Sequence, residues 1–415
     1  MRHGGHEGNM SRKSQHRRSG ESDARRQPGR ASRAERSGTA GERHALARAG
    51  KRRRRRRLRR ALVAALVALV LVAGACVALV MRANHRAAQT GDAATSQNGQ
   101  TDIAASDVVM TLGGSADTYV LKGEDYLEAG CHAVDRTEGD ITSTVKTQGK
   151  VDTSKAGDYT VTYTARASGG AKARAKRTVH VVDSFESGTA ASLPVLMYHY
   201  VYTRANPPAD LNNNYLLDTQ FEEQLRYLSQ NGYYYPSYEE VRGFVDGTHS
   251  LPAKSVVLTF DDGEAGFLEY GTPLLAKYQV PATSFVICSD DDAADKIVRY
   301  ANPYVQFQSH SYDMHRDGTN IGKGGIIYAL SQDEIVSDLR QAQQVLGTTE
   351  AFAYPYGDND DKAQAAVEQA GILCAFTVHN DRVRPGDNPY ALSRVRIASE
   401  YTEAGFEYLV EPEAR

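Results

Sequence analysis

The stretch Ser255-Val256-Val257-Leu258-Thr259-Phe260-Asp261-Asp262-Gly263 decides the fold of the C-terminal half of this 415-residue chain. Its first six residues form an apolar run of strand length, and two adjacent carboxylates and a glycine follow where the strand would end. In parallel α/β barrels the functional side chains gather at the carboxyl ends of the strands. The stretch therefore predicts a buried strand and, directly after it, a site that contains Asp261 and Asp262.

Further apolar runs of strand length surround this stretch, and amphipathic segments separate them. This alternation is typical of a parallel α/β fold. Two helices are predicted from capping boxes, one at Thr219 with Glu222 and one at Ser331 with Glu334. A region of about 220 residues with this pattern predicts an incomplete or distorted β/α barrel over 193–415. The candidate strands are Pro194–Tyr198, Ser255–Phe260, Thr283–Ile287, Val305–Gln308, Ala351–Ala353, Leu373–Thr377 and Leu392–Ile397.

Two other polar clusters follow strands of the predicted sheet. They are Ser309-His310-Ser311-Tyr312-Asp313-Met314-His315 and Phe352-Ala353-Tyr354-Pro355-Tyr356-Gly357. A spacing of five residues would put the two histidines about 140° apart on a helix, so they can share a metal only from a turn. Two imidazoles and one carboxylate with an open position form a catalytic zinc set, beside which a second carboxylate can act as base. Alone, the Asp-Asp-Gly and Tyr-Pro-Tyr-Gly motifs are typical of turns, and two nearby histidines are typical of the protein surface. Their joint occurrence at strand ends indicates a site.

These clusters resemble the motifs of the polysaccharide deacetylases, carbohydrate esterase family 4, over roughly residues 194–400. The resemblance implies a distorted (β/α) barrel of the polysaccharide deacetylase type. It also implies that Asp261 is the general base and that Asp262, His310 and His315 are the metal ligands. Zinc is the default metal for such ligands, although cobalt, nickel or manganese would also suit the site.

The form of the histidine motif, together with Pro194-Val195-Leu196-Met197-Tyr198-His199, is similar to the family branch that acts on the exopolysaccharide poly-N-acetylglucosamine. The implied reaction is hydrolysis of an N-acetyl amide. A water deprotonated by Asp261 would attack the acetyl carbonyl, and the backbone N–H of Tyr356 would bind the resulting oxyanion, a contact worth about 3 kcal/mol. The leaving amine would then take a proton from a positioned imidazolium.

The sequence departs from the commoner family pattern in three places, one of which is the Asp-Trp-containing motif, since the chain has no Trp. The late Leu-x-Leu-x-His motif, which supplies the acid, is replaced by Leu392-Ser393-Arg394-Val395-Arg396-Ile397. In the exopolysaccharide branch the acid comes from the first strand instead, which matches His199, and His379 is a weaker candidate. The usual Arg before the Pro-Tyr-Gly turn is also missing, and Arg394 is the candidate to hold Asp261 in its place.

Residues 108–183 alternate short apolar runs with Gly, Asp and Ser, which predicts a small all-β sandwich of antiparallel strands. The phrases Glu138–Thr142, Gly149–Tyr163 and Thr178–Asp183 resemble bacterial surface immunoglobulin-like domains. Such domains act as spacers or as weak polymer-binding modules, and both interpretations stay open here. A short linker, 184–192, joins this segment to the predicted catalytic region.

The net charge of −2 hides a strong asymmetry. Residues 1–60 contain 21 Lys/Arg and 5 Asp/Glu, which leaves 28 and 46 for residues 61–415. The basic segment has few bulky apolar side chains and is predicted to be a disordered cytoplasmic tail. Residues 61–81 are uncharged and, as a helix of ~31 Å, would cross a ~30 Å hydrocarbon core. The alternatives for this run are a cleaved secretory signal, a lipoprotein signal at Cys76 and a buried core helix.

The basic run Lys51–Arg60 precedes the predicted transmembrane helix, so the positive-inside rule places the N-terminus in the cytoplasm. Residues 82–107 form a polar linker, and everything beyond it should be extracellular. Beside a membrane the basic run indicates attraction to anionic lipids rather than binding of nucleic acid. The sequence thus predicts a single-pass membrane protein whose catalytic domain faces outward.

The expected function is metal-dependent removal of N-acetyl groups from poly-β-1,6-N-acetylglucosamine or peptidoglycan at the cell envelope. Two alternatives use the same residues differently. One is an esterase that removes O-acetyl groups from xylan-like polymers, and the other is a non-catalytic surface protein that only binds glycan. Loss of the late histidine favours the second alternative, while retention of both aspartates and both histidines argues against it. Cys288 and Cys374 lie in apolar strands, where buried free thiols are expected and a disulfide is the alternative.

Overall fold

The computed structural model of the protein describes residues 107–318, 323–348 and 350–413. The predicted cytoplasmic tail, the predicted transmembrane helix and nearly all of the first linker lie outside these ranges. Among the residues that are described, no helix is both long and apolar enough to span a bilayer. The single-pass topology therefore stays a prediction from sequence.

The first part of the described chain is a β-sandwich of two sheets. One sheet has the strand order β1-β3-β4 and the other the order β2-β7-β6-β5. The side chains alternate between buried and half-buried over Val161–Ala165 of β6 and Arg177–Val182 of β7, because each strand has one face on the core. The expectation of a purely antiparallel sandwich is wrong in one place, since β2 pairs with β7 in parallel. The strands are β1 (Val108–Leu112), β2 (Asp117–Leu121), β3 (Cys131–Asp135), β4 (Gly139–Asp140), β5 (Lys146–Gln148), β6 (Gly157–Arg166) and β7 (Lys172–Val182).

The second part is built on a seven-stranded sheet in which every neighbouring pair is parallel, in the order β17-β16-β13-β12-β11-β8-β18. All seven candidate strands are present, so the predicted parallel α/β fold is confirmed. The barrel is incomplete, because β17 and β18 end the strand order and do not pair with each other in the described residues. An isolated bridge between Phe376 and Leu392 links β17 to the segment that leads into β18. The strands are β8 (Val195–Tyr198), β11 (Val257–Phe260), β12 (Ala282–Val286), β13 (Val305–Ser309), β16 (Ala351–Ala353), β17 (Cys374–Phe376) and β18 (Val395–Arg396).

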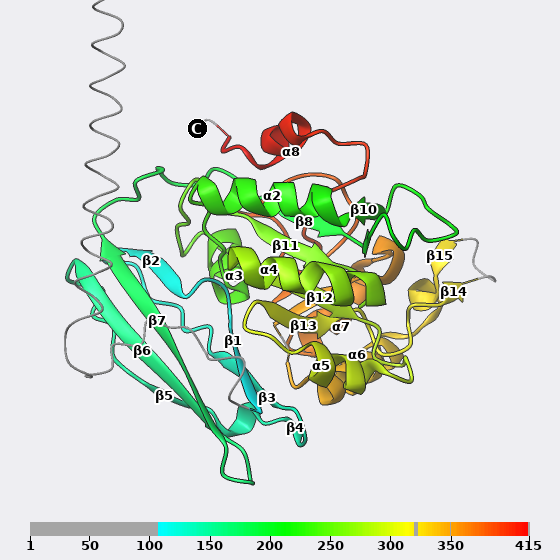
Figure 1. Ribbon diagram of the computed structural model, residues 1–415, viewed down its shortest axis with the longest axis horizontal. Helices are drawn as coiled ribbons and strands as arrows, with labels where there is room; N and C mark the ends of the chain where they lie inside the picture. Colours follow the sequence, from blue (N-terminus) through cyan, green and yellow to red (C-terminus); the bar gives the residue numbers. More distant parts are fainter. Residues whose placement is uncertain (1–106, 319–322, 349, 414–415) are drawn as a thin grey trace, which may run out of the picture. The chain divides into compact units, whose positions relative to one another are not determined.

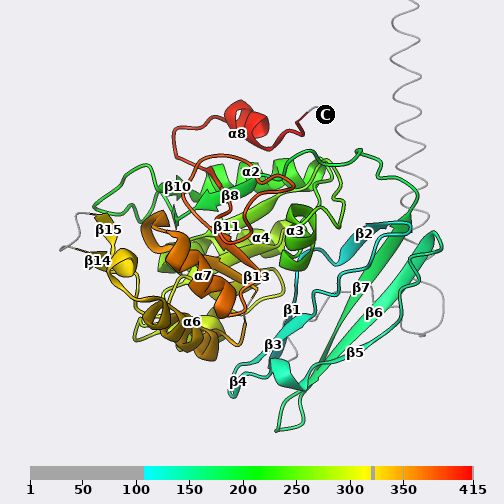
Figure 2. The same cartoon turned by 180° about the vertical axis from the view of Figure 1, so that it is seen from behind.

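Helices cover the sheet, with α2 beside α4 in Figure 1 and α6 beside α7 in the reverse view of Figure 2. Helix α6 begins after Ser331, whose hydroxyl accepts from the Glu334 N–H, as predicted, and it ends at Gly347, which has a left-handed backbone. The predicted cap at Thr219 is wrong, because α2 begins at Asp218 directly after β10, and Gln220 caps the Leu217 N–H. The helices are α2 (Asp218–Gln230), α3 (Tyr238–Val245), α4 (Thr272–Tyr278), α5 (Ala293–Tyr300), α6 (Gln332–Leu346), α7 (Asp361–Gln369) and α8 (Glu403–Val410).

Several short elements lie near the strand ends. A π-helical turn, Phe267–Gly271, leads into α4, and a 3-10 turn, Pro355–Gly357, follows β16. Two small two-stranded sheets complete the region, β9 (Tyr200–Tyr202) with β10 (Tyr215–Leu217) and β14 (Asp317–Gly318) with β15 (Lys323–Gly325).

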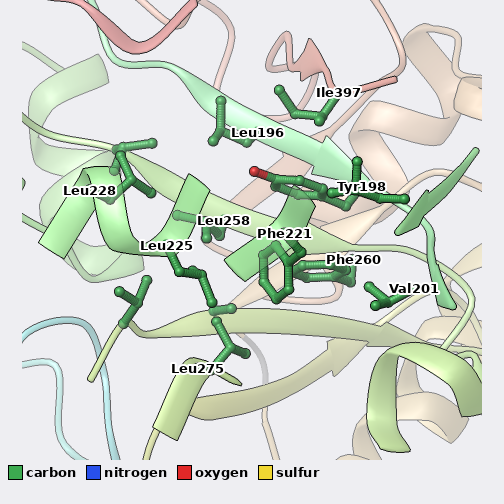
Figure 3. Packing of buried hydrophobic residues seen from close by; sticks show 14 of the residues in the cluster. Leu196, Tyr198, Val201, Phe221, Leu225, Leu228, Leu258, Phe260, Leu275 and Ile397 are labelled. Atoms are coloured by element: carbon green, nitrogen blue, oxygen red, sulfur yellow. The ribbon is translucent and has the colours of Figure 1, made fainter. Parts of the chain in front are cut away.

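An aromatic stack ties β8 and β11 to the helices on one face of the sheet (Figure 3). The rings of Tyr198 and Phe260 stack at 4.7 Å, and Phe267 stacks on the other face of Phe260 at 3.7 Å. The edge of Phe221 from α2 meets both Tyr198 and Phe260, and all four side chains are buried. Tyr198 and Phe260 are the last residues of their strands, so this packing fixes the position of whatever follows them.

Polar side chains of the sandwich contact the second part of the chain, and the described residues of both parts fall within one compact unit. His132 Nε2 lies 2.8 Å from Glu350 Oε1, and the Ser250 N–H and hydroxyl donate to Glu124 at 2.9 and 2.7 Å. The Thr111 hydroxyl donates to the Asn302 carbonyl at 2.8 Å.

The described cysteines are buried free thiols. Burial raises the pKa of the Cys288 thiol to about 12, which keeps it protonated and unreactive at ordinary pH. The alternative of a disulfide between Cys288 and Cys374 is therefore wrong.

Candidate active site

The register of β8 and β11 brings His199 and the aspartate pair together. Phe260 pairs with Tyr198 in parallel, and the Asp261 N–H donates to the Tyr198 carbonyl at 3.1 Å. The next residue of each strand therefore leaves the sheet at the same edge. His199 Nε2 lies 4.0 Å from Asp261 Oδ2.

The register of β12, β13 and β16 places the first ligand histidine. Val286 pairs with Ser309, Ser309 pairs with Phe352, and the His310 N–H donates to the Val286 carbonyl at 2.9 Å. His310 thus emerges at the same edge of the sheet as the aspartates, buried and one strand away from the Pro355–Gly357 turn.

The three predicted metal ligands converge at this edge. Asp262 Oδ1 lies 3.4 Å from His310 Nε2 and 3.3 Å from His315 Nε2, and the potential ligand atoms of the three residues all lie within 4.8 Å of one another. Burial would raise the pKa of the Asp262 carboxyl, but the two histidines and a tyrosine hydroxyl lower it far below its ordinary value. The carboxylate is therefore ionised, as a metal ligand must be.

The donor atoms suit a divalent transition metal. His310 Nδ1 lies 2.8 Å from the Ala353 carbonyl, which accepts only from a protonated nitrogen. When His310 is neutral, this bond places its one proton on Nδ1 and leaves Nε2, which lies 3.4 Å from Asp262 Oδ1, able to bind a metal. Two imidazole nitrogens and one carboxylate oxygen form a donor set suited to zinc and its neighbours in the first transition row.

Asp261 forms a bidentate ion pair with Arg394. Arg394 Nη1 lies 2.7 Å from Oδ1 and Nη2 lies 2.8 Å from Oδ2, and both residues are buried. Burial would raise the pKa of the Asp261 carboxyl, but the charges of Arg394 and His310 outweigh it and lower the pKa. The structure thus places Arg394, from the segment that replaces the late histidine motif, against the predicted base.

Of the two candidate acids, only His199 lies beside the aspartates. Burial lowers its pKa, which the charges of Asp261 and Asp262 partly offset. His379 is exposed, and its Nδ1 contacts the Ser393 hydroxyl at 3.0 Å. Within the described part of the chain no contact joins His379 to either aspartate, so the structure does not bring this candidate to the site.

Tyr356 lies at the rim of the site. Its ring stacks on the His315 imidazole at 4.6 Å and is 43% exposed. Tyr356 has a left-handed backbone, with φ of 59°, and the same is true of Asp262 at 71° and Ser311 at 79°. All three are non-glycine residues in a costly conformation, and all three lie in the loops that carry the predicted catalytic groups.

Two residues that hold these loops were not singled out from the sequence. Both carboxylate oxygens of Asp338, on α6, accept backbone bonds at 2.7 Å from Tyr312 and Asp313, inside the turn that joins the two histidines. A polar residue between Ile335 and Leu339 on the buried face of a helix was the available signal. Tyr200, the neighbour of His199, donates from its hydroxyl to Asp262 Oδ2 at 2.7 Å.

Both parts of the chain match known families. Residues 110–181 match the family model described as bacterial surface protein, Ig-like domain, and residues 248–375 match the polysaccharide deacetylase model. The chain is similar to the poly-β-1,6-N-acetyl-D-glucosamine N-deacetylase of Staphylococcus aureus strain MRSA252, with 26% identity over 217 residues, or 48% of this chain and 72% of the relative. The protein of the same name from Staphylococcus epidermidis is 25% identical over 213 residues, or 47% and 72% of the two chains.

Two solved structures are also similar to this chain. The Streptococcus pyogenes deacetylase PplD in complex with acetate is 25% identical and has a TM-score of 0.46, with 54% of this chain and 100% of that chain covered. The structure of IcaB from Ammonifex degensii is 25% identical with a TM-score of 0.43, and the match covers 53% and 96% of the two chains.

Proposed function

We propose that the chain is a metal-dependent hydrolase that removes N-acetyl groups from a polymer of N-acetylglucosamine. The support is the match to the polysaccharide deacetylase model, which follows the match to the bacterial Ig-like domain along the chain. The observation that carries this proposal is the joint arrangement at one sheet edge. Asp262, His310 and His315 form a set of metal-binding atoms. The ionised Asp261 lies beside this set and forms two hydrogen bonds with Arg394.

In this proposal Asp262, His310 and His315 hold the metal, and Asp261 is the general base. A bound divalent metal lowers the pKa of water and polarises a carbonyl oxygen. Arg394 keeps Asp261 ionised and oriented through two parallel hydrogen bonds, so the carboxylate can take a proton from the attacking water. The Tyr356 backbone N–H is the proposed donor to the oxyanion, and its rigid turn suits that role.

His199 is the proposed acid that protonates the leaving amine. Burial lowers the pKa of its imidazole, so a protonated His199 would give up its proton readily. Its side chain is only 19% exposed, which limits exchange of that proton with bulk water. The amide C–N bond then breaks, and the products are acetate and a free amine on the sugar.

Poly-β-1,6-N-acetylglucosamine is the proposed substrate. The support is the activity for which the staphylococcal relatives are named and the motif form around His199. Peptidoglycan and O-acetylated xylan-like polymers are acted on by the same kind of site, and the experiment below includes both.

The test is acetate release by the chain from Asp107 to Arg415, incubated with β-1,6-linked N-acetylglucosamine oligomers, peptidoglycan and acetylated xylan. We expect release from the oligomers that stops with a chelator, returns with zinc and is absent in Asp261→Asn. Release from peptidoglycan alone would correct the substrate, and release from xylan alone would make the enzyme an esterase. A folded, metal-loaded protein that releases acetate from none of them would contradict the proposal and favour a glycan-binding protein.

We also propose that the chain is anchored in the cell membrane by residues 61–81, with the catalytic domain outside and the basic tail near anionic lipids. The support is the uncharged 21-residue run and the Arg-rich segment before it. Cells that express the full chain should expose the catalytic domain to added protease and retain the protein in the membrane fraction. Recovery of the full chain in the soluble fraction would contradict the anchor.

A further inference from the structure

The two oxygens of the Asp262 carboxylate have different partners. Oδ1 faces the Nε2 atoms of His310 and His315, at 3.4 and 3.3 Å. Oδ2 points away from this pair and accepts the hydroxyl hydrogen of Tyr200, with an oxygen–oxygen distance of 2.7 Å. Oδ1 is therefore directed at the predicted metal position, and Oδ2 is hydrogen-bonded to Tyr200.

Tyr200 is well placed to hold that oxygen, because its own position is fixed. It is the first residue of β9 and pairs in parallel with Tyr215 of β10, and its N–H donates to the Asn214 carbonyl at 3.1 Å. Its ring packs against the ring of Tyr215 at 4.7 Å, tilted by 48°, and its edge meets His199 at 5.7 Å. A hydroxyl on an anchored ring can orient the carboxylate in the way that partners of metal ligands do.

We infer that Tyr200 is a positioning residue that makes Asp262 offer a single oxygen to the metal. A carboxylate with both oxygens free can bind a cation through either one or both, and binding through both uses up one more coordination position. By engaging Oδ2, Tyr200 would keep Asp262 from taking that position, which would stay open for a reacting oxygen. This inference rests on the metal site of the proposed function, and it assigns a role to a residue outside the three-ligand set.

The test uses the full-length protein in detergent as wild type, Tyr200→Phe and Tyr215→Phe. Tyr215→Phe is the matched control, because it removes a hydroxyl from the neighbouring ring, and that hydroxyl contacts Asp210 at 3.2 Å rather than Asp262. Cobalt(II) is the probe, because its affinity can be measured by competition with a coloured chelator and its visible spectrum reports the number of ligands.

We expect cobalt affinity to fall roughly 10- to 100-fold in Tyr200→Phe, together with weaker visible bands as Asp262 contributes a second oxygen. Tyr215→Phe should keep the wild-type affinity and spectrum. Wild-type affinity and spectrum in Tyr200→Phe would overturn the inference while leaving the metal site intact. Wild-type protein that binds no cobalt would overturn both this inference and the proposed metal site. Cobalt binding with the expected Tyr200 effect but no acetate release would contradict only the proposed reaction.

Discussion

Two arginines, one in each part of the chain, are completely buried and yet differ in how their charge is satisfied. Arg394 in the sheet domain uses every nitrogen. Its Nε donates to the Thr377 carbonyl at 2.9 Å, Nη1 donates to the Thr259 hydroxyl at 3.2 Å and to Asp261, and Nη2 donates to Asp261.

Arg177 in the sandwich is much less well paired. Its Nη2 donates to the Gly113 carbonyl at 2.7 Å and approaches the Gly130 carbonyl at 3.4 Å. In the part of the chain that the structure describes, its Nε and Nη1 have no hydrogen-bond partner. Its guanidinium lies 6.0 Å from the centre of the Tyr163 ring, so a cation–π contact replaces an ion pair.

The difference shows what a buried charge is used for. Pairing two buried ions is no reliable source of stability, because the cost of removing both from water offsets their attraction. Asp261, as the proposed base, has to keep one orientation, and Arg394 holds it with two hydrogen bonds while its other donors bond to Thr259 and Thr377. Arg177 in the sandwich holds no carboxylate in place, and in the described residues its Nε and Nη1 donors have no hydrogen-bond partner.

The largest effect is expected when Arg394 is replaced by Met. The variant leaves the Asp261 carboxylate buried without its partner, so the free energy of unfolding should fall by about 3–5 kcal/mol. Acetate release should fall at least ~100-fold, because the base is no longer held in place. Denaturant unfolding and the oligomer assay measure the two losses. Arg396→Met, a change to an exposed neighbour, is the control, and equal effects of both variants would contradict the assigned role.

A double variant, Asp261→Leu with Arg394→Met, separates stability from catalysis. Replacing both ions by apolar side chains should recover most of the stability that Arg394→Met alone loses, because no unpaired charge stays buried. Acetate release should stay absent. The free energies of unfolding of the wild type, both single variants and the double variant form the required cycle. A double variant less stable than Arg394→Met would show that the pair stabilises the fold itself.

A smaller effect is expected at His132, whose imidazole on the sandwich contacts Glu350 of the sheet domain. Burial lowers the pKa of His132, but Glu350 outweighs this and raises it above 6.5. Burial raises the pKa of Glu350, and His132 outweighs this and lowers it below 4.5. Because the pKa of His132 is raised on folding, its contribution to stability is complete below pH 6.5 and is lost as the pH rises through the pKa of the folded state. Because the pKa of Glu350 is lowered on folding, its contribution is present above pH 4.5.

The advantage of the wild type over His132→Gln should therefore be greatest between pH 4.5 and 6.5, at about 1 kcal/mol. It should shrink as the pH is raised further, when the imidazole loses its charge. Unfolding in denaturant at pH 5.5 and pH 9 measures this. An advantage that grows toward pH 9 would contradict a charged pair.

The smallest effect is expected for Arg177→Met. The variant loses the bond to the Gly113 carbonyl, and it also removes a buried charge that lacks full pairing, so the two terms oppose each other. The free energy of unfolding should change by less than about 1 kcal/mol, and acetate release should be unchanged. A loss as large as that of Arg394→Met would show that the contrast between the two arginines is wrong.

Much of the sheet domain was predictable because its strands and the motifs that follow them are short stretches of consecutive residues. Strands such as β8, β16 and β17 are short apolar runs, and the predicted functional motifs follow their strands directly, as Asp261 follows Phe260 and His310 follows Ser309. The bond from Tyr200 to Asp262 joins residues 62 positions apart, and it depends on how β9 and β11 are placed rather than on any local pattern. The parallel pairing of β2 with β7 was missed for the same reason. The cap at Thr219 was missed because β10 runs into α2 without a loop.

The left-handed backbones of Asp262, Ser311 and Tyr356 have a consequence for anyone who engineers this protein. Such conformations cost a non-glycine residue about 1–3 kcal/mol each, and glycine would adopt them freely. A search for heat-tolerant variants would thus be drawn to glycine at these three positions. Each such gain would remove a side chain at the catalytic edge: the carboxylate of Asp262, the hydroxyl that receives the Met314 N–H, or the ring that covers His315. Thermal tolerance and turnover are in direct competition at these residues, so improvement of one without loss of the other has to come from elsewhere in the chain.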